Sequence, residues 1–344
     1  LEKLAKDGLI FRNMFSHAPE TNPSVASLFS STYTSTHGVF TTVSGEKLSD
    51  EALTVQEILK ENGYYTAAFV ANFALKKNLG FGQGFVEYNY CLPSKPHEKE
   101  LFLFKLSHKA VILPVYFPQH YYLQANLLTK KIKAWLPKQN SKFFLYIHYM
   151  EPHTPYFAHP YNGYAFSRDS EEFVEMIFSR ERATKLYDGE IKHVDKSIGD
   201  LIDYLKRLDL YDDLLLVVTS DHGEELLDHG RYGHQRTLYE EVIKVPLIIK
   251  FPKNKRRGTV DSLAGIIDVA PTILDALNFQ IPKQWHGKSL LDTQIPKEEQ
   301  YVFSEDINPE DTTGEVKGEC FSLRTHLWKL ILSTKRDFSP SELF

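Results

Sequence analysis

The chain has 344 residues, of which 42% are hydrophobic and 25% are charged, and its formal net charge at pH 7 is −5. This composition excludes a disordered or fibrous chain. Basic residues do not outnumber acidic ones, which argues against nucleic acid as a partner. Two cysteines, Cys91 and Cys320, exclude a disulfide framework and a cysteine-based zinc cluster. We expect two free thiols in the core rather than one disulfide.

The early part of the chain carries signals for helices and a strand in turn. Pro23 suits the first turn of a helix, and Thr21 lies just before it. Asp50 is the predicted N-cap of a helix that ends at Gly63, and residues 64–70 then favour a strand.

The same alternation continues along the rest of the chain. Apolar periodicity predicts helices at 128–135, 191–208 and 270–277, buried strands at 143–149, 214–219 and 246–250, and late strands at 301–304, 321–324 and 328–333. Continuous apolar runs are typical of strands buried on both faces. Strands that alternate with helices predict an α/β layered domain with a largely parallel sheet.

We divide the chain into a main domain at 1–300 and a small antiparallel C-terminal subdomain at 301–344. Residues 93–137 are interpreted as an insertion or a substrate-side cap because their start is the least regular part of the sequence. No apolar run reaches the ~20 residues of a membrane span. The chain starts at Leu1 rather than Met, so a cytoplasmic location is expected only if the part before it carries no signal or anchor.

The strongest chemical signal follows the predicted strand at 214–219. In open α/β sheets, ligands bind outside the carboxyl ends of the strands. Asp221 and His222 lie at that end, beside Gly223, so a carboxylate and an imidazole can face one cation. The alternative is a helix-capping aspartate beside a surface histidine.

A second candidate lies beyond the strand at 143–149. Pro152 and Pro155 stiffen this loop and fix the direction of His153, which can protonate a leaving group or bind an anionic oxygen. For His148 a core histidine bonded to backbone is an equally good interpretation.

The third candidate is Thr21, at the start of a helix. Free backbone N–H groups at a helix start bind anions, and a hydroxyl held there beside a metal can attack a sulfate or phosphate ester. Spacing alone favours the plainer alternative, in which Thr21 or Asn22 caps the helix.

Taken together, these segments resemble the sulfatase family of the alkaline phosphatase superfamily. The matching segments, in chain order, are 21–28 with Tyr33 and 37–39, 63–70, 148–156, 187–190 with 219–225, 239–241 with 245–249, and 267–274. The resemblance implies a three-layer sandwich with a mostly parallel central sheet and a small antiparallel piece near the C-terminus.

The resemblance also implies roles for individual residues. It makes Thr21 the nucleophile and assigns a divalent cation (Ca²⁺, Mn²⁺, Mg²⁺ or Zn²⁺) to Asp221, His222 and Thr21. His153, His234 and His37 match further catalytic positions, the last two less closely. Asn72 matches a substrate-binding position.

This sequence departs from the family pattern in four places. Thr21 replaces the Cys or Ser that is oxidised to formylglycine, and so resembles the branch of phosphoglycerol and phosphoethanolamine transferases and related hydrolases. Val25 replaces an Arg, and Asn72 replaces a Lys. A first strand with metal-binding aspartates is expected before Leu1, and residues 341–344 resemble the start of a motif that is cut short, so we interpret the chain as truncated at both ends.

The resulting expectation is a metal-dependent hydrolase, possessing phosphodiesterase character, that cleaves sulfate or phosphate esters of small molecules, lipids or glycans. One alternative is a phosphoglycerol- or phosphoethanolamine-type transferase. Another is a non-catalytic sulfatase-like binding protein, favoured by the missing Lys and Arg. The sequence predicts no oligomeric state.

Overall fold

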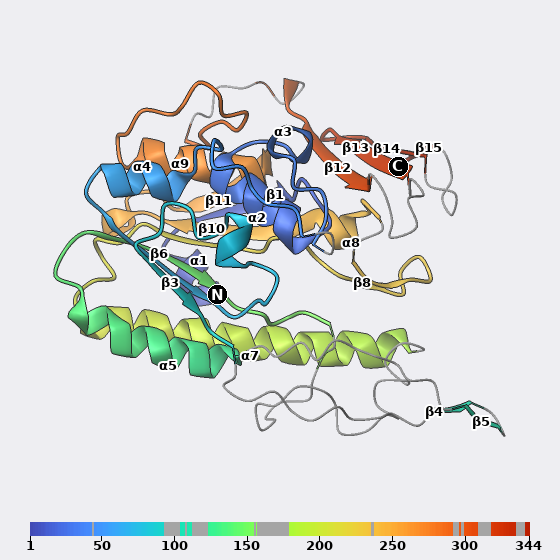
Figure 1. Cartoon of the computed structure of the whole chain (residues 1–344), viewed down its shortest axis with the longest axis horizontal. Helices are drawn as coiled ribbons and strands as arrows, with labels where there is room; N and C mark the ends of the chain where they lie inside the picture. Colours follow the sequence, from blue (N-terminus) through green and yellow to red (C-terminus); the bar gives the residue numbers. More distant parts are fainter. Residues whose placement is uncertain are drawn as a thin grey trace.

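The computed structural model describes residues 1–42, 45–92, 104–106, 109–111, 123–154, 156, 179–234, 237–291, 296, 299–308, 318–334 and 341–344. Its core is a layer of strands between two layers of helices (Figure 1). This arrangement is the α/β sandwich that the sequence predicts.

The strand layer contains two sheets. The larger sheet has the order β11 (Gly258–Gly265), β1 (Leu9–Phe15), β10 (Lys244–Lys250) and β7 (Leu216–Thr219), and the smaller has the order β3 (Glu87–Tyr90), β2 (Tyr65–Val70) and β6 (Phe143–His148). The smaller sheet is parallel throughout. In the larger sheet β1 and β11 are parallel, whereas β10 runs antiparallel to both β1 and β7.

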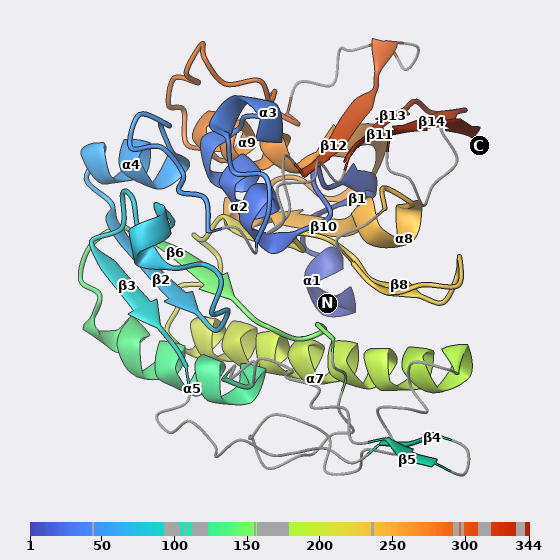
Figure 2. The ribbon, with the colours of Figure 1, turned by 45° about the vertical axis from the view of Figure 1, so that its right-hand side comes forward.

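Helices cover both faces of this layer. Figure 2 shows α5 (Ala125–Trp135) and α7 (Arg180–Arg207) on one face, with α2 (Thr21–Ser30), α4 (Val55–Glu61) and α9 (Val269–Ala276) on the other. One apolar core joins α5 and α7 to the strands through Leu128, Ile132 and Leu201. A second core joins α2 to β2 through Val25 and Val70.

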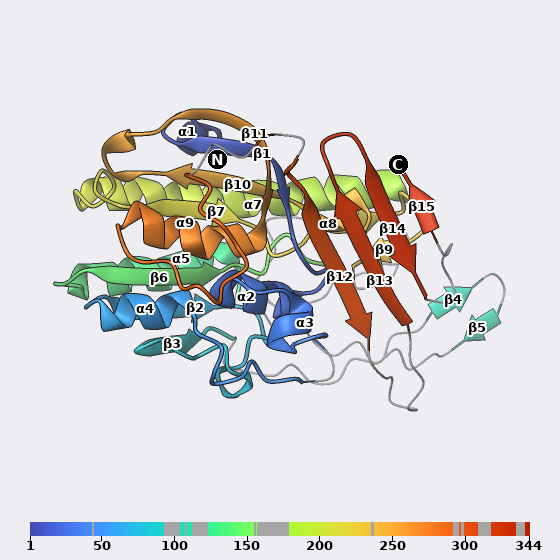
Figure 3. The same cartoon turned by 90° about the horizontal axis from the view of Figure 1, so that it is seen from above.

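The predicted antiparallel piece near the C-terminus is confirmed. It is a sheet with the order β12 (Val302–Asn308), β13 (Gly318–Arg324), β14 (Lys329–Ser333) and β15 (Ser341–Leu343), and it lies beside the main sheet (Figure 3). Val302, Cys320 and Ile331 pack against Phe15 and Ile243, so the two sheets share a small core.

Short elements complete the described chain. They are α1 (Glu2–Ala5), α3 (Thr34–His37), α8 (Glu240–Ile243), β4 (Phe104–Leu106), β5 (Lys109–Val111), β8 (Glu225–Leu226), β9 (Tyr232–Gly233), and 3-10 turns at Lys77–Leu79, Leu136–Lys138, Pro252–Asn254 and Ile266–Asp268. Much of the predicted insertion at 93–137 lies outside the described residues, although α5, near its end, belongs to the helical layer. No helix in the described ranges is long and apolar enough to span a membrane.

Two helix starts differ from the prediction. The helix α4 begins at Val55, because Thr54 and Glu57 form a capping box in which the Thr54 backbone N–H donates to the Glu57 carboxylate at 2.9 Å. The predicted cap, Asp50, instead accepts from Lys47 at 2.7 Å. Thr21 is the first residue of α2 rather than the residue before it, and Glu20 takes the cap position.

The burial of two strands also differs from the prediction. The apolar runs in β6 and β7 are half-buried at every residue, whereas β2 is buried at every residue after Tyr65. Both β6 and β7 lie at an edge of the sheet to which they belong. Burial on both faces depends on neighbouring strands, which a local run of apolar residues does not reveal. Both cysteines are buried free thiols, as expected.

Candidate active site

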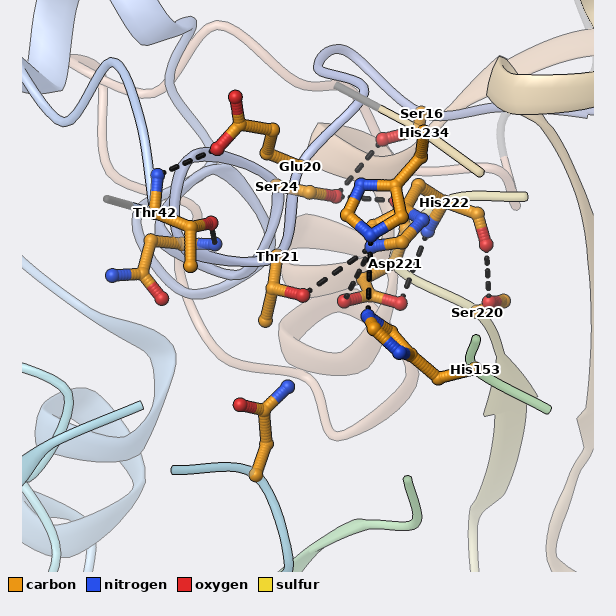
Figure 4. A network of polar contacts seen from close by, with 12 residues as sticks. Ser16, Glu20, Thr21, Ser24, Thr42, His153, Ser220, Asp221, His222 and His234 are labelled. Carbon is orange, nitrogen blue, oxygen red and sulfur yellow. Dashed lines mark hydrogen bonds and ion pairs between the residues drawn. The ribbon is translucent and has the colours of Figure 1, made fainter. Parts of the chain in front are cut away.

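Five of the predicted site residues converge near the carboxyl ends of strands. Thr21 opens α2 after β1, His153 follows β6, and Asp221 and His222 follow β7. His234 comes directly after β9. Figure 4 shows all five side chains around one small space, where the strand-end rule places a ligand site.

Thr21 is held against an imidazole. Its Oγ1 lies 3.3 Å from Nε2 of His222, whose Nδ1 lies 2.9 Å from the carbonyl oxygen of Gly223. Because Nδ1 donates to that carbonyl, Nε2 is the acceptor of the Thr21 hydroxyl. The carboxylate of Asp221 lies 3.7 Å from the same nitrogen. The threonine side chain therefore faces the imidazole and the carboxylate rather than capping its own helix.

A buried serine fixes this geometry. Ser24 Oγ donates to the backbone carbonyl of Asp221 at 2.6 Å and lies 2.9 Å from Ser16 Oγ. Ser24 is fully buried one turn beyond Thr21 on α2. The bond ties the start of α2 to the loop after β7, so it sets the position of Thr21 relative to Asp221 and His222.

A second buried carboxyl group precedes Thr21. Glu20 accepts from the backbone N–H of Thr42 at 2.6 Å, and burial raises the pKa of Glu20 to about 7. Sequence reasoning gave Glu20 no role. A carboxylate at a helix cap is common, so only the place of Glu20 beside Thr21 could have suggested a role for it.

Neighbouring charges shift the pKa of Asp221 in the direction opposite to that of burial. Burial alone would raise the pKa of Asp221, but His222, His148 and His153 hold it below its usual value. Burial, together with His222 and His153, lowers the pKa of His234 well below 6.5. An ionised carboxylate beside a neutral imidazole leaves lone pairs on both side chains, which is the state that a cation requires.

Two histidines face each other at one side of the site. Nε2 of His153 lies 3.1 Å from Nε2 of His234. Glu224 accepts from the backbone N–H of Thr154 at 3.2 Å, and burial raises the pKa of Glu224 to about 7. Ligand atoms of His153, Glu224 and His234 all lie within 4.8 Å of one another. The sequence analysis missed Glu224, although its place three residues after Asp221 was a usable signal.

Two other predicted site residues have different surroundings. His37 ends α3, with Nε2 at 3.0 Å from Ser27 Oγ, and its Nδ1 accepts from the Val39 N–H at 3.1 Å. Both of its ring nitrogens thus bond to α2 and to the following loop rather than to Thr21 or Asp221. Burial lowers the pKa of His37 to about 3.

Asn72 contacts the backbone of Ala74 and the side chain of His148. It accepts from the Ala74 N–H at 2.8 Å, and its amide nitrogen lies 3.4 Å from Nε2 of His148. His148 in turn contacts the Tyr146 hydroxyl at 3.0 Å. The histidine is therefore bonded to side chains, not to the backbone as one of the two interpretations had it.

Two family models match this chain. A family model described as Sulfatase matches residues 1–279, and a model described as N-sulphoglucosamine sulphohydrolase, C-terminal, matches residues 228–343.

Individual proteins that resemble this chain align with it at low sequence identity. Arylsulfatase K of Gallus gallus is 28% identical over 178 residues, which cover 50% of this chain and only 33% of the relative. The multifunctional alkaline phosphatase superfamily protein PehA of Trinickia caryophylli is 26% identical over 371 residues, covering 85% of this chain and 70% of that protein. Among solved structures, the phosphonate monoester hydrolase of Silicibacter pomeroyi shares the fold, with a TM-score of 0.76 and 23% identity over 100% of this chain and 83% of that one.

Proposed function

Because the chain belongs to the sulfatase family, we propose that it cleaves sulfate or phosphate esters with the hydroxyl of Thr21 as the attacking group. The observation that carries this proposal is the contact of Thr21 Oγ1 with Nε2 of His222 at 3.3 Å, at the start of α2. A threonine cannot give the aldehyde that Cys or Ser gives on oxidation, so its own oxygen is the available nucleophile.

The family implies a divalent cation, and the residues present fit one. Asp221 offers a carboxylate, His222 the ring nitrogen Nε2, and Thr21 a hydroxyl oxygen, all near one another. A divalent cation bound there would stabilise negative charge on the attacking oxygen and on the transferred group.

The chain's own side chains account for the bond changes. Thr21 Oγ1 forms a bond to the sulfur or phosphorus atom while the bond to the ester oxygen breaks. A cation on Nε2 of His222 would occupy the one free lone pair of that ring, so this nitrogen is not the base in the step. The Thr21 hydroxyl gives up its proton as the new bond forms, and the departing alcohol takes up that proton. Attack by water on the Thr21 ester then releases sulfate, or the phosphate monoester that remains from a phosphodiester, and restores the hydroxyl. His153 and His234 lie beside His222, where they can stabilise the ester oxygens.

Substitution of the nucleophile tests the proposal. Turnover of p-nitrophenyl sulfate and bis-p-nitrophenyl phosphate is measured for the parent, Thr21→Ala and Thr21→Ser. We expect Thr21→Ala to lose at least ~100-fold in rate, as for other lost transition-state contacts, and Thr21→Ser to keep part of it. Ser30→Ala is the matched control, because the Ser30 hydroxyl lies on the same helix and donates to Ala26 at 2.8 Å.

The same assay separates the alternatives. We expect faster turnover of the phosphodiester than of the sulfate, because Thr21 provides no aldehyde. Parental rates in Thr21→Ala would show that a water molecule, not Thr21, is the nucleophile. No turnover of either ester by the parent would favour the non-catalytic binding protein.

A transferase uses the same first step and differs only in the second. The Thr21 ester would then pass its group to an acceptor alcohol instead of water. Product analysis with glycerol or ethanolamine present distinguishes the two, because a transferase yields a new ester of the added alcohol, whereas a hydrolase yields p-nitrophenyl phosphate from the diester or sulfate from the sulfate ester.

A further inference from the structure

Three imidazole rings in the site share one orientation. Each points its Nδ1 at a backbone carbonyl oxygen and its Nε2 into the site; the pairs are His153 with Thr154, His222 with Gly223 at 2.9 Å, and His234 with Pro19 at 3.1 Å. A ring that donates through Nδ1 keeps a lone pair on Nε2. Metal-binding histidines are typically oriented by this kind of bond to a backbone carbonyl group.

His153 and His234 differ from His222 in what their Nε2 atoms face. Nε2 of His222 accepts from Thr21, whereas Nε2 of His153 and Nε2 of His234 face each other at 3.1 Å. Because both rings donate through Nδ1, this contact requires either a proton or a cation between the two Nε2 atoms. Two nitrogen ligands about 2.1 Å from a tetrahedral zinc ion would be roughly 3.4 Å apart, which is close to the observed separation.

Glu224 supplies a carboxylate to the same place. Its Oε1 accepts from the Thr154 N–H at 3.2 Å, so the residue that orients His153 also orients Glu224. Its Oε2 is buried and makes no hydrogen bond of good geometry in the described ranges, although the Tyr156 hydroxyl lies near enough to the carboxylate to lower the pKa of Glu224. Oε2 of Glu224 lies 3.8 Å from where a Cβ of Gly233 would be, and so it faces the turn that carries His234. The ligand atoms of the three residues lie within 4.8 Å of one another.

We infer that His153, Glu224 and His234 bind a second cation, distinct from the one assigned to Asp221, His222 and Thr21. Two imidazole nitrogens and one carboxylate with an open fourth position suit Zn²⁺. The inference rests on the proposed function, because that function places His153 and His234 at the ester oxygens. In the inference, a cation bound to these residues contacts the ester oxygens in place of the imidazole rings. A cation there would stabilise the charge that develops on the departing oxygen.

The test is cobalt binding by the full-length, metal-free protein. Co²⁺ takes zinc sites and reports its coordination through visible absorption. We expect Glu224→Gln and His153→Gln to lose one equivalent of Co²⁺, with affinity at least ~100-fold weaker, and to lose the corresponding absorption. Asp221→Asn should keep that equivalent. Glu225→Gln is the matched control, because the neighbouring Glu225 is equally buried but accepts from the His229 N–H at 3.0 Å.

The outcomes separate this inference from the proposed function, because cobalt binding does not require turnover. Unchanged stoichiometry and absorption in Glu224→Gln would overturn the second site, even if Thr21→Ala is inactive. Loss of that equivalent together with full activity of Thr21→Ala would overturn the nucleophile alone. If Glu224→Gln fails to fold by circular dichroism, His153→Gln, on a separate loop, decides by the same two measurements.

Discussion

The site has two halves that differ in what their side chains face. In the threonine half (Thr21, Asp221 and His222), the hydroxyl, carboxylate and imidazole contact one another. In the histidine half (His153, Glu224 and His234), two nitrogens face each other beside a buried carboxylate. In the account proposed above, the first half holds the nucleophile and the second binds a cation between its members.

The two halves also depend on largely different parts of the fold. Ser24 on α2 bonds to the backbone of Asp221 and so joins two elements of the main layer. The histidine half is held by the backbone of Thr154, in the loop after β6, by the turn around β9, and by the carbonyl of Pro19, to which His234 bonds at 3.1 Å. Pro19 lies just before Thr21, so the segment before α2 is common to both halves.

The largest effect is expected from a substitution in the threonine half. Asp221→Asn should lower kcat/KM by ~1000-fold and remove one metal equivalent, because it removes the ionised carboxylate beside Thr21. The fold should survive, since Asp221 lies just beyond the end of β7. Steady-state kinetics, metal analysis and thermal unfolding check this. A normal metal content with normal turnover would show that Asp221 neither binds a cation nor takes part in turnover.

The next effect separates a site histidine from a supporting one. His153→Ala should lower kcat by ~100-fold with little change in stability. His37→Ala should keep turnover within a few-fold and lower the free energy of unfolding by ~1–3 kcal/mol, because it loses bonds to Ser27 and Val39. Urea unfolding and kinetics on both variants measure the contrast. Equal losses of activity would place His37 in the site after all.

A smaller effect is expected when the hydrogen bond between α2 and the loop after β7 is removed. Ser24→Ala should lower kcat by ~10-fold, because Thr21 loses its fixed position, and cost ~1 kcal/mol in unfolding free energy. Cobalt binding by His153 and His234 should remain at the parental level. Loss of that equivalent in Ser24→Ala would show that the two halves are one coupled unit.

The smallest effect on turnover is expected at the loop that carries His153, where the change is a pH dependence of stability. Burial raises the pKa of Glu151 from 4.5 to about 8, and the carboxyl accepts from the Ala125 N–H at 2.9 Å. Between these two pH values the folded chain binds more protons than the unfolded chain, so the free energy of unfolding falls as pH rises through this range. Each pKa unit corresponds to about 1.4 kcal/mol at most.

Glu151→Gln should remove that contribution and flatten the dependence. Urea unfolding of the parent and the variant at several values between pH 5 and pH 8 provides the measurement. Parallel curves for the two proteins would mean that Glu151 is ionised in the folded chain throughout this range.

Much of this site follows from sequence, because apolar runs mark strands and polar residues after them mark strand ends. That reasoning places Asp221, His222 and His153 near one another, as the structure shows. It also gave the five main helices and four of the strands of the main layer, but it missed β1, β3 and β11. It did not give the half-burial of β6 and β7, because the exposure of a strand depends on the strands beside it.

Adjacent carboxylates mark the limit of sequence reasoning. Glu224 turns toward His153 and His234, whereas Glu225 accepts from the His229 N–H. The backbone of the turn decides which way each side chain points, and Leu227 in that turn has a φ of 67°. Nothing in the residue types separates the two glutamates. Thr21 is a similar case, because a cap and a nucleophile have the same side chain and only the contact with His222 distinguishes them.

The most direct test of the account is to find the covalent intermediate. Full-length protein is mixed with a phosphodiester, quenched with acid within milliseconds, digested and analysed by mass spectrometry. The account predicts, on the peptide that contains Thr21, a phosphoryl group that still carries the second ester group of the phosphodiester, with the fragment ions placing it on that side chain, and no such peptide from Thr21→Ala. A burst of product with the Thr21 peptide unmodified, or a phosphoryl group on another residue, would contradict it.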